Sequence, residues 1–149
     1  MLDQRIRSVM ERKKLLTAPP ETSVREAAKR MARRKVGAVL VVEGKRLVGI
    51  FTERDAVFRV MASGRDAQAT RLAEVMTPSP QTLTPDELFG YALLVMHENG
   101  FRHIPVVEDG EPIGMVTSRM ALDPDLEEFV SETQRRKRFR RQPADTSAK

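Results

Sequence analysis

The chain has 149 residues, of which 40% are hydrophobic and 32% charged, and this suits one compact domain or two half-size units that share a core. No stretch approaches the roughly 20 apolar residues of a membrane helix, the charged N-terminus lacks the apolar segment of a signal peptide, and without cysteine there is no disulfide or thiolate metal site. We therefore expect a cytoplasmic protein. The net charge of +5 comes from the C-terminal run Arg135–Arg141, because the other basic residues nearly balance the 21 acidic ones.

The chain contains an internal repeat. An offset of 65 positions aligns Pro20–Ala56 with Pro85–Ala121 and gives ten identities in 37 positions, where chance gives roughly two or three. Val9-Met10 matches Val75-Met76 at an offset of 66. A repeat this long that occurs twice indicates a duplicated domain rather than a solenoid. It predicts a first unit over 1–66, a second over 67–123, and a C-terminal helix with a basic tail over 124–149.

The first copy predicts an extended segment, a helix, a hairpin and a second helix. The extended segment lies near Leu15–Thr17, and apolar residues at helical spacing predict a helix over Thr22–Lys35. Strands follow over Ala38–Val42 and Leu47–Phe51, and the second helix begins after Thr52 and ends near Gly64.

The second copy predicts the same order. Its extended segment is Gln81–Leu83, its helix is Asp86–Asn99 with Gly100 as the terminating residue, and its strands are His103–Val107 and Ile113–Val116. The helix after Thr117 is cut short by Asp123-Pro124, a pair that can open a new helix. Together the copies predict an α/β fold.

Residues Gly49–Asp55 carry the most informative motif. A glycine at a strand end lets a ligand approach the backbone, Thr52 offers a hydroxyl, and the Asp55 carboxylate can accept hydrogen bonds from two vicinal hydroxyls, as in a ribose. Thr-x-x-Asp is also close to a capping box, in which both side chains only satisfy backbone donors. The repeat favours the ligand reading, because both copies keep the glycine, the threonine and an arginine (Arg54 and Arg119), and a cap needs neither Gly49 nor Arg54.

With these motifs the sequence resembles a tandem pair of cystathionine-β-synthase (CBS) domains, a Bateman module. The resemblance covers about Ile6–Leu122 and includes the two Val-Met pairs, the stretch Phe101–Val107 and the two Gly-x-x-Thr segments. It implies two units related by a pseudo-twofold axis, with small sheets packed together and helices outside. It also implies adenosine ligands between the units, frequent dimerisation and a regulatory role.

The resemblance implies ribose binding at Thr52 and Asp55, and phosphate contacts from Arg102, His103 and Arg119 of the other repeat. Arginine and histidine donors suit a phosphate. Arg102 and His103 can equally be exposed residues that flank a buried strand. In the second copy Met120 replaces the aspartate beside Thr117, which puts the second cleft in doubt. AMP, ADP or ATP is the expected ligand, with NAD and S-adenosylmethionine as alternatives.

Other functions find less support in the sequence. His97 and His103 have no matched carboxylate or cysteine pattern, so we expect neither catalysis nor a metal site, and no cofactor. Apolar helix residues, Met31, Ala32, Met61, Leu94 and Val95, predict a symmetric homodimer. An alternative function is a nucleotide-gated adaptor that binds nucleic acid or an acidic protein partner through Arg135–Arg141.

Overall fold

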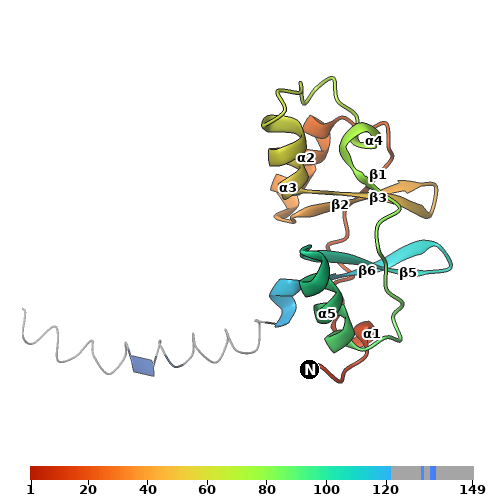
Figure 1. Ribbon diagram of the computed structural model, residues 1–149, viewed down its shortest axis with the longest axis vertical. Coiled ribbons are helices and arrows are strands. Elements are labelled where there is room, and N and C mark those ends of the chain that lie inside the picture. The colour runs from red at the N-terminus through yellow and green to blue at the C-terminus, as the bar shows by residue number, and fades with distance from the viewer. Residues whose placement is uncertain (122–131, 133–134, 137–149) are drawn as a thin grey trace, which may run out of the picture. The chain divides into compact units, whose positions relative to one another are not determined.

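The computed structural model describes residues 1–121, 132, 135 and 136 (Figure 1). It divides into two compact units, Met1–Thr117 and Ser118–Lys149. The described part of the second unit begins with the short 3-10 helix η2, Ser118–Ala121. The helix predicted from Asp123-Pro124 and most of the basic run lie outside the described residues. In the part of the chain that is described, no helix is long and apolar enough to cross a membrane.

The first repeat forms a four-stranded sheet in the order β1-β2-β3-β4. Its strands are β1 Thr17–Ala18, β2 Ala38–Glu43, β3 Arg46–Thr52 and β4 Thr77–Pro78. Helix α2, Val24–Arg34, begins where the Ser23 hydroxyl accepts a hydrogen bond from the backbone nitrogen of Glu26 at 3.1 Å. It ends at Lys35 in the left-handed conformation, with φ of 56°. Thr52 is followed by α3, Glu53–Asp55, and by the π-helix η1, Ala56–Met61.

The second repeat has the same hairpin and the same first helix. Helix α5, Phe89–Asn99, ends at Gly100 with φ of 73°, which confirms the predicted terminating glycine. Strands β5, His103–Glu108, and β6, Glu111–Thr117, pair with the register of β2 and β3 moved by the 65-residue offset, from Ala38↔Thr52 to His103↔Thr117. Even the register shift after Val41 recurs after Val106. The repeated hairpins predicted from the sequence are confirmed.

Each repeat is completed by the segment that leads into the other one. Helix α1, Ile6–Val9, packs beside α5 of the second repeat, where the Ile6 nitrogen donates to the Glu87 carbonyl at 2.9 Å. Helix α4, Leu72–Val75, leads into the second repeat but packs on the first, where its Leu72 nitrogen donates to the Thr22 carbonyl at 2.9 Å. Figure 1 shows α1 beside α5 and α4 near α2. The two repeats therefore exchange their N-terminal segments.

This exchange explains where both long helices begin. They start two and three residues later than predicted, because the residues before them pair as extended backbone with an exchanged segment: Ser23 with Arg71, and Leu88 with Arg5. The predicted extended segment at Gln81–Leu83 is reduced to a single bridge, from Leu83 to Val106. The helix predicted after Thr52 is one α-turn followed by a π-helix, in which the bonds reach one residue further back.

The core lies between helices and sheets and continues between the two sheets. In the first repeat, Phe51 and Val39 of the sheet and Ala27 of α2 are fully buried in one cluster. A second cluster joins Leu40 and Ile50 of the first sheet to Met115 of the second, so the sheets pack together with helices outside. Among the residues predicted at a dimer surface, Met31 and Val95 are 7% and 3% exposed. That part of the prediction is wrong, because both side chains fill the core.

Candidate functional site

The first wall of the site is the turn from β3 into α3. Thr52 ends the strand in extended conformation, and its hydroxyl accepts a hydrogen bond from the Asp55 nitrogen at 3.3 Å. In return, Asp55 Oδ2 accepts from the Thr52 nitrogen at 2.9 Å and from the Thr52 hydroxyl at 3.1 Å. The capping box that the sequence allowed is therefore present. It locks the carboxylate of Asp55 in one orientation, with its side chain only 13% exposed.

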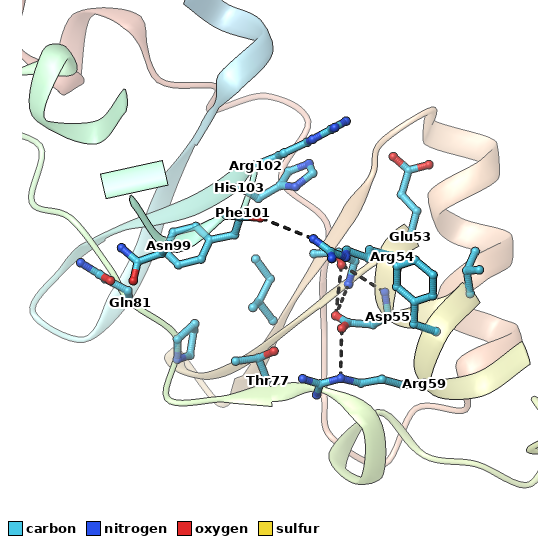
Figure 2. A pocket seen from close by; sticks show the side chains of 16 residues that line it. Glu53, Arg54, Asp55, Arg59, Thr77, Gln81, Asn99, Phe101, Arg102 and His103 are labelled. Atoms are coloured by element: carbon cyan, nitrogen blue, oxygen red, sulfur yellow. Dashed lines mark hydrogen bonds and ion pairs between the residues drawn. The ribbon is translucent and has the colours of Figure 1, made fainter. Parts of the chain in front are cut away.

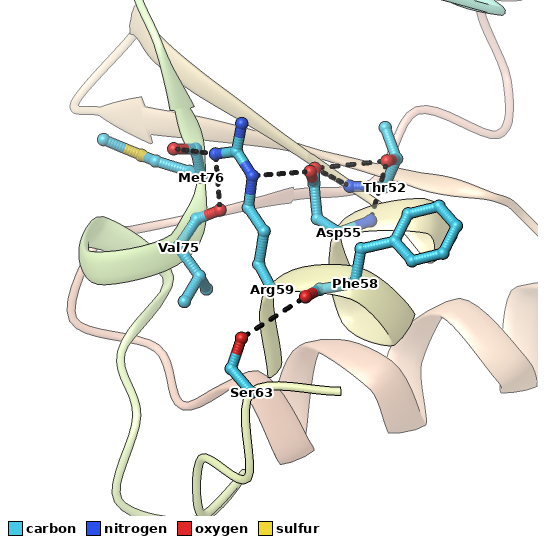
Figure 3. Close-up of polar contacts among 7 residues, drawn as sticks. All are labelled: Thr52, Asp55, Phe58, Arg59, Ser63, Val75 and Met76. Atoms are coloured by element: carbon cyan, nitrogen blue, oxygen red, sulfur yellow. Dashed lines mark hydrogen bonds and ion pairs between the residues drawn. The ribbon is translucent and has the colours of Figure 1, made fainter. Parts of the chain in front are cut away.

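The other oxygen of Asp55 has a different environment. Arg59 Nε lies 3.4 Å from Oδ1 as an ion pair, while Arg59 Nη1 donates to the carbonyls of Val75 and Met76 at 3.2 Å each (Figure 3). Among the described residues Oδ1 accepts no hydrogen bond. A carboxylate oxygen has two lone pairs, so Oδ1 can accept hydrogen bonds from a ligand without disturbing the cap.

The second wall comes from the other repeat, at the start of β5. The left-handed Gly100 ends α5 and turns the chain, so that Phe101, Arg102 and His103 follow on the cavity side (Figure 2). Arg54 reaches across from the first repeat: its Nη1 donates to the Gly100 carbonyl at 3.5 Å, and its guanidinium lies 5.3 Å from the centre of the Phe58 ring. Arg54 thus links the two walls.

Between the walls is a cavity of about 920 Å³. It contains four of the five residues predicted for the site, Thr52, Asp55, Arg102 and His103, although the two pairs come from different repeats. Arg119 lies on η2 in the second unit, so its predicted phosphate contact stays a prediction. The full lining is Ile50, Thr52, Glu53, Arg54, Asp55, Val57, Phe58, Arg59, Thr77, Pro80, Gln81, Asn99, Gly100, Phe101, Arg102 and His103.

Sequence reasoning missed most of the remaining lining. Arg59 carried a usable signal, because a basic residue four positions after Asp55 on a helix faces that carboxylate. Phe101 was visible as the apolar neighbour of Arg102. Thr77 and Gln81 carried no signal, because they lie outside the aligned repeat Pro85–Ala121 and stand in no motif.

His103 is the titratable group of the cavity with an altered acidity. Burial lowers its pKa from the usual 6.5, the Glu53 carboxylate opposes that change, and the Arg102 guanidinium adds to it. At neutral pH the imidazole is therefore uncharged. An anion held between Arg102 and His103 would favour uptake of a proton by the imidazole.

The arrangement suits binding of an anionic, hydroxyl-bearing ligand. One wall offers a fixed carboxylate oxygen, the other offers a guanidinium and an imidazole, and apolar side chains such as Ile50, Pro80 and Phe101 also line the cavity. Among the described residues, no group of three or more His, Asp or Glu side chains is placed to hold a metal ion.

Known proteins share this architecture. The chain is 42% identical over 104 residues to the CBS domain-containing protein CBSCBSPB3 of Arabidopsis thaliana, an alignment that spans 69% of this chain but 19% of the relative. Among solved structures, an uncharacterized conserved protein from Pyrococcus horikoshii matches with a TM-score of 0.77 and 30% identity, over 84% of this chain and 94% of its own. A CBS domain protein from Pyrobaculum aerophilum, complexed with AMP, matches with a TM-score of 0.72 and 25% identity, over 78% of this chain and 89% of its own.

The model of the CBS domain family matches the chain twice, over residues 6–62 and 72–124. Each match falls on one copy of the internal repeat, and each copy carries the same hairpin in the same register. The two copies also complete one another through their exchanged N-terminal segments. The chain therefore belongs to the CBS domain family, and its two repeats are a tandem pair of CBS domains.

Proposed function

We propose that the cavity binds one adenine nucleotide, with AMP as the first candidate, and that the chain is a regulatory sensor rather than an enzyme. The observation that carries this proposal is the pairing of opposite chemistries in one cavity. Asp55 from the first repeat is fixed by its cap and has an oxygen, Oδ1, that accepts no hydrogen bond from the described residues, and Arg102 and His103 from the second repeat line the same cavity. A nucleotide presents vicinal hydroxyls and a phosphate, which suit a carboxylate and basic side chains respectively.

In this proposal the ribose hydroxyls donate to Asp55 Oδ1. The Thr52 hydroxyl donates to Asp55 Oδ2 and so holds the carboxylate in place. Arg102 and His103 bind the phosphate, and two N–H groups of the guanidinium can donate hydrogen bonds to two phosphate oxygens. The adenine ring packs among the apolar side chains of Ile50, Pro80 and Phe101, which offer the flat and apolar surface that a base requires. The AMP complex of the Pyrobaculum aerophilum relative supports this choice of ligand.

Regulation follows from where the cavity lies. Its walls come from both repeats, so a ligand that contacts both stabilises one arrangement of the pair over others. A regulatory nucleotide-sensing module fits a CBS domain pair.

We also propose one nucleotide per chain, and a homodimer. The second copy offers Thr117 without an aspartate, because Met120 cannot accept a hydrogen bond from a ribose hydroxyl as a carboxylate does. Arg119 remains a proposed phosphate contact. For the dimer, Met61 and Leu94 are 76% and 50% exposed, with Phe58 and Tyr91 as exposed apolar neighbours. A mass near 16.9 kDa in light scattering at micromolar concentration would refute the dimer.

The test of the ligand is a thermal-shift panel of AMP, ADP, ATP, NAD, S-adenosylmethionine and adenosine. A ligand at 100 times its Kd adds about 2.7 kcal/mol of stability, which raises Tm by several degrees. We expect AMP to raise Tm and adenosine to raise it less, because adenosine lacks the phosphate. A panel in which no compound shifts Tm would refute the proposal.

A further inference from the structure

Glu53 is the acidic residue placed at the basic end of the cavity. It lines the cavity between Thr52 and Arg54, and Figure 2 shows its side chain extending away from the Asp55 carboxylate, on the side where Arg102 and His103 lie. The capping box does not use it, because the cap is made by Thr52 and Asp55 alone. Within the described residues, Glu53 forms no ion pair.

The position of this side chain is set by the first repeat. The Glu53 nitrogen donates to the Gly37 carbonyl at 3.0 Å, and a Cβ at position 37 would lie 2.5 Å from Glu53 Oε1. The glycine at that position therefore leaves the room that the carboxylate occupies. Its charge is also felt across the cavity, since it acts on the acidity of His103 in the opposite sense to Arg102.

We propose that Glu53 is a specificity-determining residue that makes the cavity favour a nucleoside monophosphate over a di- or triphosphate. The proposal rests on the function proposed above and deepens it. The first phosphate group lies against Arg102 and His103, and there the charge of the Arg102 guanidinium offsets the repulsion from Glu53. Each additional phosphate brings further negative charge to the same end of the cavity. No further attraction offsets it there, so each additional phosphate adds repulsion from Glu53.

The experiment compares the Kd of AMP and ATP by titration calorimetry at pH 7.5 in EDTA, for the unmodified chain and for Glu53→Gln. The variant keeps the size and polarity of the side chain and removes only its charge. Two unit charges about 7 Å apart at the dielectric constant of water correspond to a factor of roughly two to three in affinity, so the two additional charges of ATP predict a factor of about three to ten. We expect the ratio of the ATP Kd to the AMP Kd to fall by that factor in Glu53→Gln.

Glu43→Gln is the matched control. Glu43 is exposed at the end of β2, does not line the cavity, and its substitution makes the same change in net charge. The ratio should stay constant in this control. If AMP binds and Glu53→Gln leaves the ratio unchanged, Glu53 does not determine specificity, while the function proposed above stands. If neither nucleotide binds the unmodified chain, the proposed function itself fails.

Discussion

Thr52 and Asp55 are joined by three hydrogen bonds, and all those that Asp55 accepts from Thr52 use Oδ2. The second oxygen, Oδ1, faces Arg59 at 3.4 Å and accepts no hydrogen bond from the described residues. A cap and a ligand contact are usually alternatives for one side chain. Here they are assigned to different oxygens of one carboxylate, so both can operate together.

The cap alone predicts a loss of stability. Asp55→Ala should lower the free energy of unfolding by about 0.5–2 kcal/mol, the range for losing a helix cap, measured by urea denaturation. Ser23→Ala removes a cap of the same kind at α2, away from the cavity, and should cost a similar amount. A variant Asp55→Ala as stable as the unmodified chain would show that the capping bonds contribute little.

Met10 and Met76, which directly follow the exchanged helices α1 and α4, predict a steric effect at two glycines. A Cβ at Gly114 would lie 2.5 Å from Met10 Sδ and 2.9 Å from its Cγ, and at Gly49 it would collide with Met76 in the same way. Gly114→Ala should therefore destabilise the protein by about 1–3 kcal/mol through overpacking. Chemical denaturation in a Met10→Ala background should show a smaller cost, because the colliding atoms are gone. An equal cost in both backgrounds would assign the effect to something other than Met10.

The same exchange predicts that one repeat does not fold alone. A fragment of residues 1–66 lacks α4 and Met76, which pack on its sheet, and it exposes Ile6, which is fully buried in the intact protein. A unit of about 60 residues also buries too little surface to be stable without help. Circular dichroism of the fragment should show no cooperative melting transition. A cooperative melt would mean that the first repeat is self-sufficient.

The buried imidazole predicts a dependence of stability on pH. Because burial lowers the pKa of His103 in the folded protein, the unfolded chain binds this proton more readily. Above pH 6.5 the free energy of unfolding carries no penalty from His103. It falls as the pH drops from 6.5 toward the lowered pKa of the folded state, because the unfolded chain then takes up the proton first. The opposing effect of Glu53 limits the loss, and Arg102 increases it.

The measurement is the free energy of unfolding at pH 7.5 and 5.5. We expect His103→Gln to lose less stability over this interval than the unmodified chain does. His97→Gln, at an exposed position on α5, is the control and should behave like the unmodified chain. An unchanged pH dependence in His103→Gln would contradict the assignment.

The order of helices and strands could be predicted from the sequence, because the internal repeat shows the same order twice. Two apolar runs joined by a turn and repeated at one offset indicate the strands, and Gly100 marks a helix end. The exchange of α1 and α4 could not be predicted, because Val9-Met10 and Val75-Met76 show that the segments are equivalent but not which repeat each one packs on. For the same reason Met31 and Val95 were placed at a surface: helical spacing identifies an apolar face but not what covers it.

The site was predictable where one repeat could be compared with the other. Thr52 and Asp55 stand in a motif, and Arg102 and His103 follow a helix whose end is marked by glycine. Glu53 and Arg59 acquire their roles only through the fold. Glu53 needs the space beside Gly37, and Arg59 needs the carbonyls of Val75 and Met76, which a distant part of the chain supplies.

Calorimetric titration of AMP into the unmodified chain, Asp55→Ala and Ser23→Ala tests the central claim most directly. The unmodified chain should bind one AMP per chain. Asp55→Ala should lose about 1.5–3 kcal/mol of binding free energy, the range for a hydrogen bond to a charged group, which is roughly a tenfold to hundredfold weaker Kd. Ser23→Ala loses a cap but no ligand contact and should bind AMP as the unmodified chain does. An unchanged Kd in folded Asp55→Ala would contradict the account and leave Asp55 as a helix cap alone.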